Sequence, residues 1–135
     1  MSQENVETIE RYFDAVNRGD FAEAMSAYAD DVVLVVDERI VPTNAGVFSG
    51  RDAVGEWFGD WFRSFARGYR FDIHEMRPAG ERVFVAVRHR GRGRSSGVAI
   101  DWNVGLAFAV NAGKIVRLEL FSDRSGALKA VGLEE

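Results

Sequence analysis

The spacing of apolar residues changes at Tyr69, and this change limits the possible folds more than any other feature of the chain. Before Tyr69, apolar residues recur every three or four positions, which predicts amphipathic helices. After it, apolar residues alternate with a period of two, which predicts strands. The helices are expected at residues 6–18, 20–28 and 49–68, and the strands at residues 69–76, 83–90, 98–110 and 114–122.

Two further elements complete the predicted fold. The β-branched run VVLVV at residues 32–36 is typical of a strand buried on both faces, and residues 123–133 are expected to form a short final helix. Glycine-containing turns separate the alternating runs, and no linker or repeat interrupts the chain. The sequence therefore predicts a single α+β domain over residues 1–135, with helices first and then a meander of antiparallel strands.

The charge balance argues against a protein that binds nucleic acid. Basic side chains number 17 and acidic ones 21, so the net charge is −4. The arginine-rich stretch RHRGRGRSSG at residues 88–97 lacks the interleaved aromatic residues that stack on single-stranded bases. We interpret it as a solvated hairpin, with contact to an anion as the alternative.

Several kinds of site are excluded or disfavoured. The chain has no cysteine, which excludes disulfides, thiolate metal ligands and cysteine nucleophiles. His74 and His89 stand fifteen residues apart without a metal-binding motif, and the sequence has no glycine-rich phosphate loop and no G-x-S-x-G elbow. We therefore expect neither a metal nor a cofactor.

No segment of the sequence indicates export or membrane insertion. The first ten residues, MSQENVETIE, lack the basic and apolar regions of a signal peptide. No apolar run is long enough to span a membrane. We expect a cytoplasmic protein without a membrane partner.

The run VAIDWNVGLAFAV at residues 98–110 has two different faces. Its even positions, such as Trp102 and Phe108, are bulky and apolar, whereas its odd positions, such as Asp101 and Asn103, are small or polar. The small face leaves room for the aromatic third helix and for a ligand, so we expect it to point inward. The alternative is that the helix fills this space and leaves no cavity.

The turn that follows assigns the next strand to these two faces. If a tight NAG turn pairs Val110 with Ile115, Leu118 joins the small face and Arg117 the bulky one. The bulky face would then be a large exposed apolar patch, which predicts a homodimer through the outer face of the sheet. Its expected members are Trp102, Val104, Leu106, Phe108, Arg117 and Glu119.

Segments from nearly the whole chain carry a resemblance to a known family. They are IERYFDAVNRGDFAEAMSAYADDVVLVVD, FSGRDAVGEWF, and GRGRSSG followed by GKIVRLELFSDRSGALKAVGL. The chain resembles the SnoaL-like group of the nuclear transport factor 2-like superfamily, which also includes ketosteroid isomerases. The resemblance implies a cystatin-like α+β cone: a strongly curved antiparallel sheet wrapped around N-terminal helices, with a pocket at its open end and dimerisation through its outer face. The superfamily hosts isomerases, cyclases, dehydratases, hydrolases and noncatalytic binders, so it leaves the activity open.

The resemblance carries over one catalytic position of the ketosteroid isomerases. Tyr12 matches their oxyanion-stabilising tyrosine on the first helix. Their general-base aspartate falls on Val36, so Asp37 could act only if the strand bulges. Their second, protonated acid falls on Gly105 rather than on Asp101. Steroid isomerisation is therefore not expected.

Four polar side chains are the candidates for catalysis. Asp101 on the small face would have a pKa raised by desolvation, unless it pairs with an arginine of the neighbouring strand. The resemblance points the alternate residues of the strand that carries His89 toward the pocket, where a histidine could move protons near neutral pH. The alternative for His89 is a strand end beside a turn. Asp37 and Tyr12 complete the set, and Tyr12 has an ordinary position at the core boundary as its alternative.

These residues together predict a pocket for a small apolar or polyketide-like molecule. The expected activity is that of a cofactor-independent isomerase, cyclase or lyase that uses general acid–base catalysis. The alternative is a noncatalytic ligand-binding or dimerisation module of the same fold. The residues expected to bind the substrate are Val16, Trp57, Phe58, Trp61, Val85, Val87, Asn103, Leu118 and Leu120.

Overall fold

The computed structural model describes residues 2–40, 45–66 and 68–133, which form four helices and six strands. None of the helices in these ranges is both long and apolar enough to cross a lipid bilayer. The helices are α1 (Ser2–Arg18), α2 (Phe21–Ser26), α3 (Arg51–Arg63) and α4 (Arg124–Ala130). The strands are β1 (Tyr28–Val36), β2 (Gly46–Ser49), β3 (Arg70–Ala79), β4 (Arg82–Arg92), β5 (Ala99–Asn111) and β6 (Lys114–Phe121).

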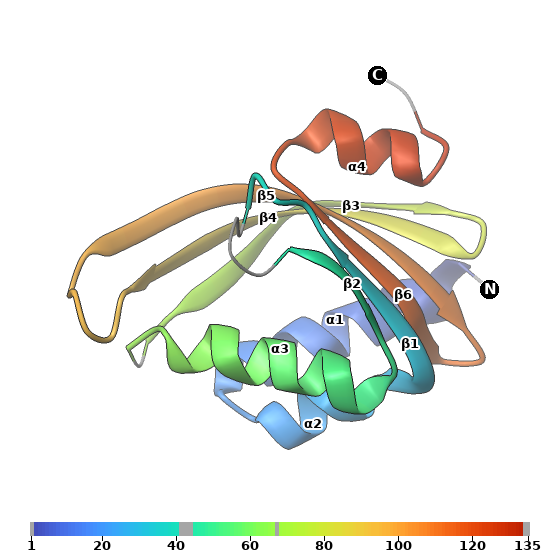
Figure 1. Ribbon diagram of the computed structural model, residues 1–135. Helices are drawn as coiled ribbons and strands as arrows, with labels where there is room; N and C mark the ends of the chain where they lie inside the picture. Colours follow the sequence, from blue (N-terminus) through green and yellow to red (C-terminus); the bar gives the residue numbers. More distant parts are fainter. Residues whose placement is uncertain (1, 41–44, 67, 134–135) are drawn as a thin grey trace.

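The strands form one sheet in the order β2-β1-β6-β5-β4-β3. β1 runs parallel to β6, and the other neighbouring pairs are antiparallel. The sheet is strongly curved, with α1, α2 and α3 against its concave side and α4 on the opposite side (Figure 1). This architecture confirms the predicted α+β cone, with a parallel pair within an otherwise antiparallel sheet.

The first two helices meet where the sequence predicted. Gly19 has a φ of +76°, a conformation that favours glycine, and its N–H donates to the Val16 carbonyl at 3.0 Å at the end of α1. The Asp20 side chain then accepts a hydrogen bond from the Glu23 N–H at 3.1 Å and begins α2. These local signals fix the turn that leads into β1.

Two predicted elements differ from the structure, and one strand was not predicted. The third helix ends at Arg63 rather than near Gly68, because the Ser64 hydroxyl and N–H both donate hydrogen bonds to the Trp61 carbonyl. Strand β2 pairs with β1, and it lies in residues 46–49, where the sequence predicted no strand. Burial alternates along β1, so the prediction of a strand covered on both faces is wrong. Its buried residues after Tyr28 are Val32, Leu34 and Val36.

A bulge in β6 changes the register between β5 and β6. Val110 pairs with Ile115 as expected, but the next pair is Ala109 with Arg117, so Val116 has no cross-strand partner. One extra residue in a strand moves every following side chain to the other face relative to its neighbour. The inward and outward faces of β5 are therefore the reverse of those predicted.

The bulky face of β5 points into the molecule. Phe108 pairs with Leu118 and Leu106 with Leu120, so the large residues of both strands share one face. The Phe108 ring packs edge-on against the ring of Tyr12 on α1, with 6.2 Å between the ring centroids. The main hydrophobic core thus lies between α1, α3 and the concave face of the sheet.

The small face of β5 accommodates α4 on the convex side. A Cβ atom on Gly105 would lie 2.6 Å from the Asp123 carbonyl oxygen and 2.9 Å from the Ala127 Cβ, so the absence of a side chain lets α4 approach the sheet. Ala107 and Phe84 form a second buried cluster with α4. The room that the sequence indicated is therefore filled by the C-terminal helix.

A second bulge, in β3, determines which side chain meets His89. The register shifts between Ile73 and Glu75, which leaves His74 without a cross-strand partner. Without this shift, counting residue pairs from the turn between β3 and β4 would place Phe71 opposite the residue that follows His89 in β4. The shift instead places Phe71 directly opposite His89.

Candidate functional site

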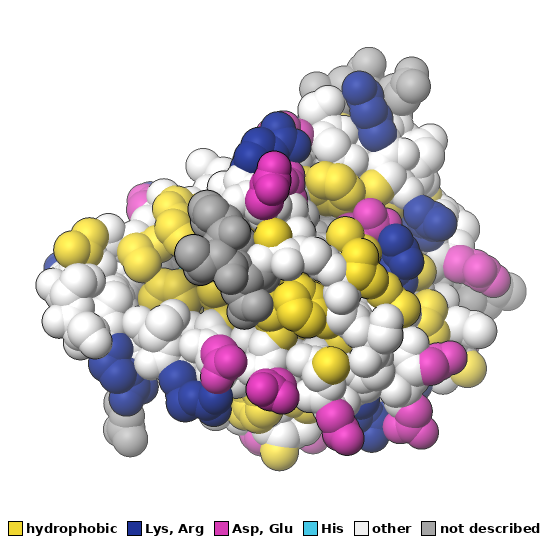
Figure 2. Space-filling model, in the orientation of Figure 1, with side chains coloured by type: hydrophobic (Ala, Val, Ile, Leu, Met, Phe, Trp, Pro, Cys, Tyr) yellow, Lys and Arg dark blue, Asp and Glu magenta, His cyan; other side chains and the backbone are white. Residues whose placement is uncertain are grey.

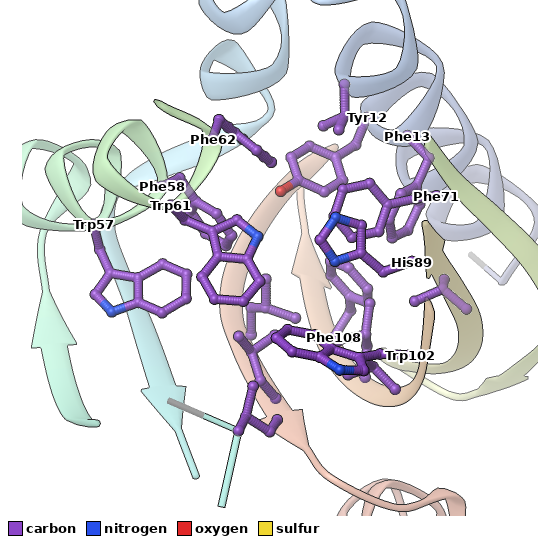
Figure 3. A pocket seen from close by; sticks show the side chains of 17 residues that line it. Tyr12, Phe13, Trp57, Phe58, Trp61, Phe62, Phe71, His89, Trp102 and Phe108 are labelled. Carbon is purple, nitrogen blue, oxygen red and sulfur yellow. The ribbon is translucent and has the colours of Figure 1, made fainter. Parts of the chain in front are cut away.

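A cavity of about 50 Å³ lies between α1, α3 and the concave face of the sheet. Aromatic and aliphatic side chains form most of its wall, and Tyr12 and His89 are the titratable residues among the described residues that line it. Figure 3 shows both of them on the side of the cavity opposite Trp57. Any proton transfer by side chains in this space therefore depends on a phenol and an imidazole.

His89 lies on β4 within a ring of aromatic side chains. Phe71 stacks on the imidazole with 4.2 Å between ring centroids, and Phe65 meets it edge-on at 4.8 Å. Trp61 and Trp102 lie at 5.8 and 6.1 Å. His89 is 1 % exposed, and its Nε2 atom has no hydrogen-bond partner among the described residues. Desolvation lowers the pKa of His89 to about 4, so the imidazole is neutral at pH 7.

Tyr12 on α1 supplies the second polar group. Its hydroxyl oxygen accepts a hydrogen bond from the Tyr28 hydroxyl at 2.6 Å, and both residues are buried. Desolvation by burial raises the pKa of both Tyr12 and Tyr28, so both stay protonated at neutral pH. Because Tyr28 donates to Tyr12, the proton of Tyr12 remains for an acceptor on a ligand.

Tryptophan rings lie between the cavity and solvent. Trp57 stacks on Trp61 at 5.6 Å, and Trp61 contacts Trp102 at 5.9 Å. Trp102 is 41 % exposed and Trp61 is half-buried. Figure 2 shows hydrophobic side chains gathered between α3 and the sheet on this face. Small-molecule pockets usually enclose about 300 Å³ or more, so a ring-sized ligand needs these side chains to move.

Most residues predicted to bind the substrate line the cavity. Val85 is fully buried in the adjacent core and does not reach the cavity wall. Asn103 is exposed on the convex side, so its predicted place in the pocket is wrong. The residues found in the wall are Val16, Trp57, Phe58, Trp61, Val87, Leu118 and Leu120.

Asp101 does not reach the cavity. It is exposed on the convex side, and its two carboxylate oxygens accept hydrogen bonds from the Arg88 guanidinium at 2.7 and 2.5 Å. Those hydrogen bonds hold the pKa of Asp101 below its usual value, which is the reverse of the predicted shift. The predicted desolvated acid or base is wrong because the bulge in β6 turns this face of β5 outward.

Asp37 is also outside the cavity wall. Its carboxylate accepts hydrogen bonds from the Arg39 N–H at 3.0 Å and from the Arg39 Nε at 3.1 Å. These bonds lower the pKa of Asp37 and tie the side chain to its own turn. Gly105, where the ketosteroid isomerase pattern places a second acid, lies beneath α4. Of the four catalytic candidates, the cavity brings together only Tyr12 and His89.

The apolar residues predicted for a dimer surface line the cavity instead. Trp102 contacts Trp61 of α3, and Phe108 contacts Phe13 of α1 at 6.1 Å. Arg117 pairs with Glu119 at 3.1 Å in β6. The predicted surface is therefore wrong in its apolar members, which are Trp102, Val104, Leu106 and Phe108. Homodimerisation itself stays a prediction.

Several aromatic neighbours of the site were missed by sequence reasoning. Alternation along β4 indicated His89, but the bulge in β3 hid Phe71 as its stacking partner. Phe65 was assigned to a helix face, and it lies beyond the end of α3. The sequence predicts Tyr28 on the apolar face of a helix, and nothing in the sequence pattern indicates its contact with Tyr12.

The described residues offer little to a metal ion. Within residues 2–40, 45–66 and 68–133, no group of three His, Cys, Asp or Glu side chains is arranged to hold one. The described wall of the cavity also contains no carboxylate. The chemistry that this arrangement can support is proton transfer by Tyr12 and His89, together with hydrogen bonding.

A sequence model of the SnoaL-like domain matches residues 9–118 of the chain. The chain belongs to the SnoaL-like domain family. The match includes Tyr12, His89 and most of the cavity wall, so the site of this SnoaL-like protein lies within the part that defines the family. The family includes polyketide cyclases and isomerases. No curated protein matches the sequence.

Solved structures share the fold of this SnoaL-like protein. TerC, crystallised with polyporic acid, has a TM-score of 0.77 at 19 % identity, covering 95 % of this chain and 98 % of TerC. A protein of Jannaschia sp. CCS1 named as a SnoaL-like polyketide cyclase has a TM-score of 0.77 at 17 % identity, covering 99 % and 95 %. A ketosteroid isomerase-like protein of Catenulispora acidiphila DSM 44928, in complex with trimethylamine, has a TM-score of 0.74 at 14 % identity, covering 94 % and 93 %. At these identities the likeness establishes the fold alone.

Proposed function

We propose that the cavity binds a flat, apolar molecule that carries a carbonyl group and catalyses proton transfer on it, as isomerases, cyclases and lyases do. His89 would take the proton, and Tyr12 would donate a hydrogen bond to the oxygen on which negative charge develops. One observation carries the proposal: within the described part of the chain, the Nε2 atom of His89 is buried without a hydrogen-bond partner, beside a cavity whose other titratable residue is Tyr12.

The state of His89 suits a base more than an acid. Its pKa of about 4 leaves the imidazole neutral at pH 7, with one ring nitrogen free to accept a proton. An unpaired buried polar atom costs about 1–3 kcal/mol, which a ligand that pairs with it would recover. Because a base of low pKa is a weak one, the abstracted proton must be acidified by an adjacent carbonyl or ring system.

The state of Tyr12 suits an oxyanion donor. The raised pKa keeps its proton in place, and the hydrogen bond from Tyr28 fixes the position of the oxygen. A donor held in a dry site stabilises a developing negative charge without reorganisation at the moment of reaction. Tyr12 and His89 thus have complementary roles on the same side of the cavity.

The composition of the cavity wall supports this ligand class. Stacked rings such as Trp57 and Trp61 present flat apolar surfaces, and the described wall offers no charge to an ionic ligand. The polyporic acid crystallised with TerC supports the choice of an aromatic compound as a first probe. The trimethylamine in complex with the Catenulispora protein supports a small amine as a second probe, to be compared with the aromatic compound.

A noncatalytic binding protein is the second candidate, and the low pKa of His89 favours it. In that case Nε2 would hold a ligand by a hydrogen bond and no proton would move. Binding would then depend on His89, while no substrate of the cavity would be turned over.

Ring-opening of 5-nitrobenzisoxazole tests the proposal without knowledge of the natural substrate. A base removes the ring proton, the N–O bond breaks, and a nitrile and a coloured phenolate form, so base and oxyanion donor both contribute. We expect H89Q to lower the rate at least about 100-fold and Y12F about 10-fold or more. We expect D101N, a control outside the cavity, to match the wild type. If H89Q and Y12F both catalyse the ring-opening at the wild-type rate, the proposal is contradicted.

A further inference from the structure

A groove of about 710 Å³ lies at the ends of α1 and α3, beside the start of β3. Val16 and Phe62 line both this groove and the cavity, so they form a wall between the two spaces. Phe65 also lines the groove, and its ring lies 4.8 Å from the ring of His89. A single layer of side chains therefore separates the groove from the candidate site.

Aromatic rings continue through this wall. Phe62 stacks on Phe58, which lines the cavity, with 5.7 Å between ring centroids. It also stacks on Tyr69, which lines the groove, at 5.4 Å. Phe62 itself is half-buried. A ligand that passes Phe62 would thus meet apolar ring surface on both sides of the wall.

The groove differs from the cavity in charge. Three arginines from separate elements line it: Arg18 at the end of α1, Arg63 at the end of α3, and Arg94 after β4. None of the described residues that line it is acidic, although the chain has a net charge of −4. Figure 2 shows basic side chains gathered near the end of α3 that leads to β3.

The existing partners of these arginines leave room for an anion. Arg18 and Arg63 pair with neighbouring aspartates whose side chains are 46–71 % exposed, and such surface pairs contribute little free energy. The Arg94 guanidinium donates to the Phe65 carbonyl at 3.3 Å. An anion in the groove would therefore compete with weak, solvated contacts.

From this continuity and this charge pattern, we infer that the natural ligand is an apolar ring compound with an anionic group on a short chain. The ring lies in the cavity near His89, and the anion lies in the groove near Arg63 and Arg94. The inference rests on the proposed function and names its ligand class. It also explains the space: about 50 Å³ holds no ring compound with a side chain, whereas the groove of about 710 Å³ supplies the remaining room.

Two naphthalene compounds test this inference by calorimetry on the intact protein. One is 2-naphthol, which carries a ring and no anion, and the other is 4-(naphthalen-2-yl)butanoate, which adds a carboxylate on a three-carbon chain. We expect the butanoate to bind about tenfold more tightly, and R63Q/R94Q to remove that advantage while leaving the affinity for 2-naphthol unchanged. Raising the salt from about 0.05 M to about 0.5 M should weaken only the butanoate.

A matched control removes the same charge elsewhere. R77Q/R117Q changes two arginines of β3 and β6 that do not line the groove, and it should keep the preference for the butanoate. Equal affinity for the two compounds, or an equal loss in both double variants, overturns this inference and leaves the proposed function standing. If neither compound binds, the proposed function and this inference both fail.

Discussion

The rings of Phe71 and His89 lie face to face, with 4.2 Å between their centroids and 4° between their planes. This contact exists because the bulge at His74 shifts the register of β3 by one residue. The stacked ring removes water from one face of the imidazole, and Phe65 packs against the imidazole in a T-shaped contact. Together they keep His89 neutral, and among the described residues its Nε2 has no hydrogen-bond partner.

The first prediction concerns stability and pH. The pKa of His89 is about 4 in the folded chain against 6.5 for an ordinary histidine, so the unfolded chain binds more protons between these values. The free energy of unfolding should therefore fall by about 3 kcal/mol as the pH drops from about 6.5 to about 4, and this loss should be absent in H89F. Urea unfolding of the wild type and of H89F at several pH values measures both free energies of unfolding.

The control for this prediction is the other histidine of the chain. His74 is exposed at the bulge of β3, so H74Q should keep the full dependence on pH. At pH 7, H89F should also be about 1 kcal/mol more stable than the wild type, because it removes an unpaired buried nitrogen. The same pH dependence in H89F and the wild type would show that His89 is not the group responsible.

The second prediction concerns the hydrogen bond between Tyr28 and Tyr12. Y28F removes the donor to the Tyr12 oxygen and should lower the free energy of unfolding by about 1 kcal/mol. It should also slow the ring-opening of 5-nitrobenzisoxazole, because the Tyr12 hydroxyl loses the contact that positions it. Y69F serves as the control, since Tyr69 lines the groove rather than the cavity. A rate in Y28F equal to that in Y69F contradicts the positioning role.

Apart from β2, the order of helices and strands was predictable because local signals carry it. Gly19 and Asp20 mark the junction of α1 and α2, and the change of period at Tyr69 marks the start of the meander. The alternation of β4 likewise pointed His89 in the same direction as Val87, and both line the cavity. These features depend on residues close together in the chain.

The faces of β5 were not predictable, because one residue in another strand decides them. Val116 occupies the bulge of β6, and nothing in the periodicity of β6 marks it as unpaired. The sequence also did not indicate that α4 would cover Gly105 on the convex side. Small residues on a strand can pack against a helix as well as against a ligand. The predicted location of Asp101 in the pocket was wrong because it depended on the register between β5 and β6.

The third prediction tests the contact between α4 and the sheet. A Cβ on Gly105 would lie 2.6 Å from the Asp123 carbonyl oxygen, so G105V must displace α4 and should cost about 1–3 kcal/mol of unfolding free energy. A99V adds the same kind of side chain at an exposed position of the same strand and should change the stability little. Thermal unfolding of the two variants compares them, and equal midpoints would mean that α4 does not pack on Gly105.

The fourth prediction concerns Asp101. Its carboxylate is exposed and paired with Arg88 on the convex side, away from the cavity. D101N should therefore leave ligand affinity and the ring-opening rate unchanged. Its pKa is lowered in the folded chain, so any stability that the pair contributes is present above the ordinary aspartate pKa and is lost as the pH falls. A large loss of activity in D101N would show that Asp101 takes part in the site.

The central claim is that a neutral His89, whose Nε2 atom has no partner among the described residues, faces the ligand inside an aromatic cavity. The chain has two histidines, so their imidazole signals can be assigned in an NMR titration with the H74Q variant. We predict that the His89 signal titrates with a midpoint near 4, and that 2-naphthol shifts this signal without moving that of His74. A midpoint near the ordinary value of about 6.5, with no response to 2-naphthol, would contradict the account.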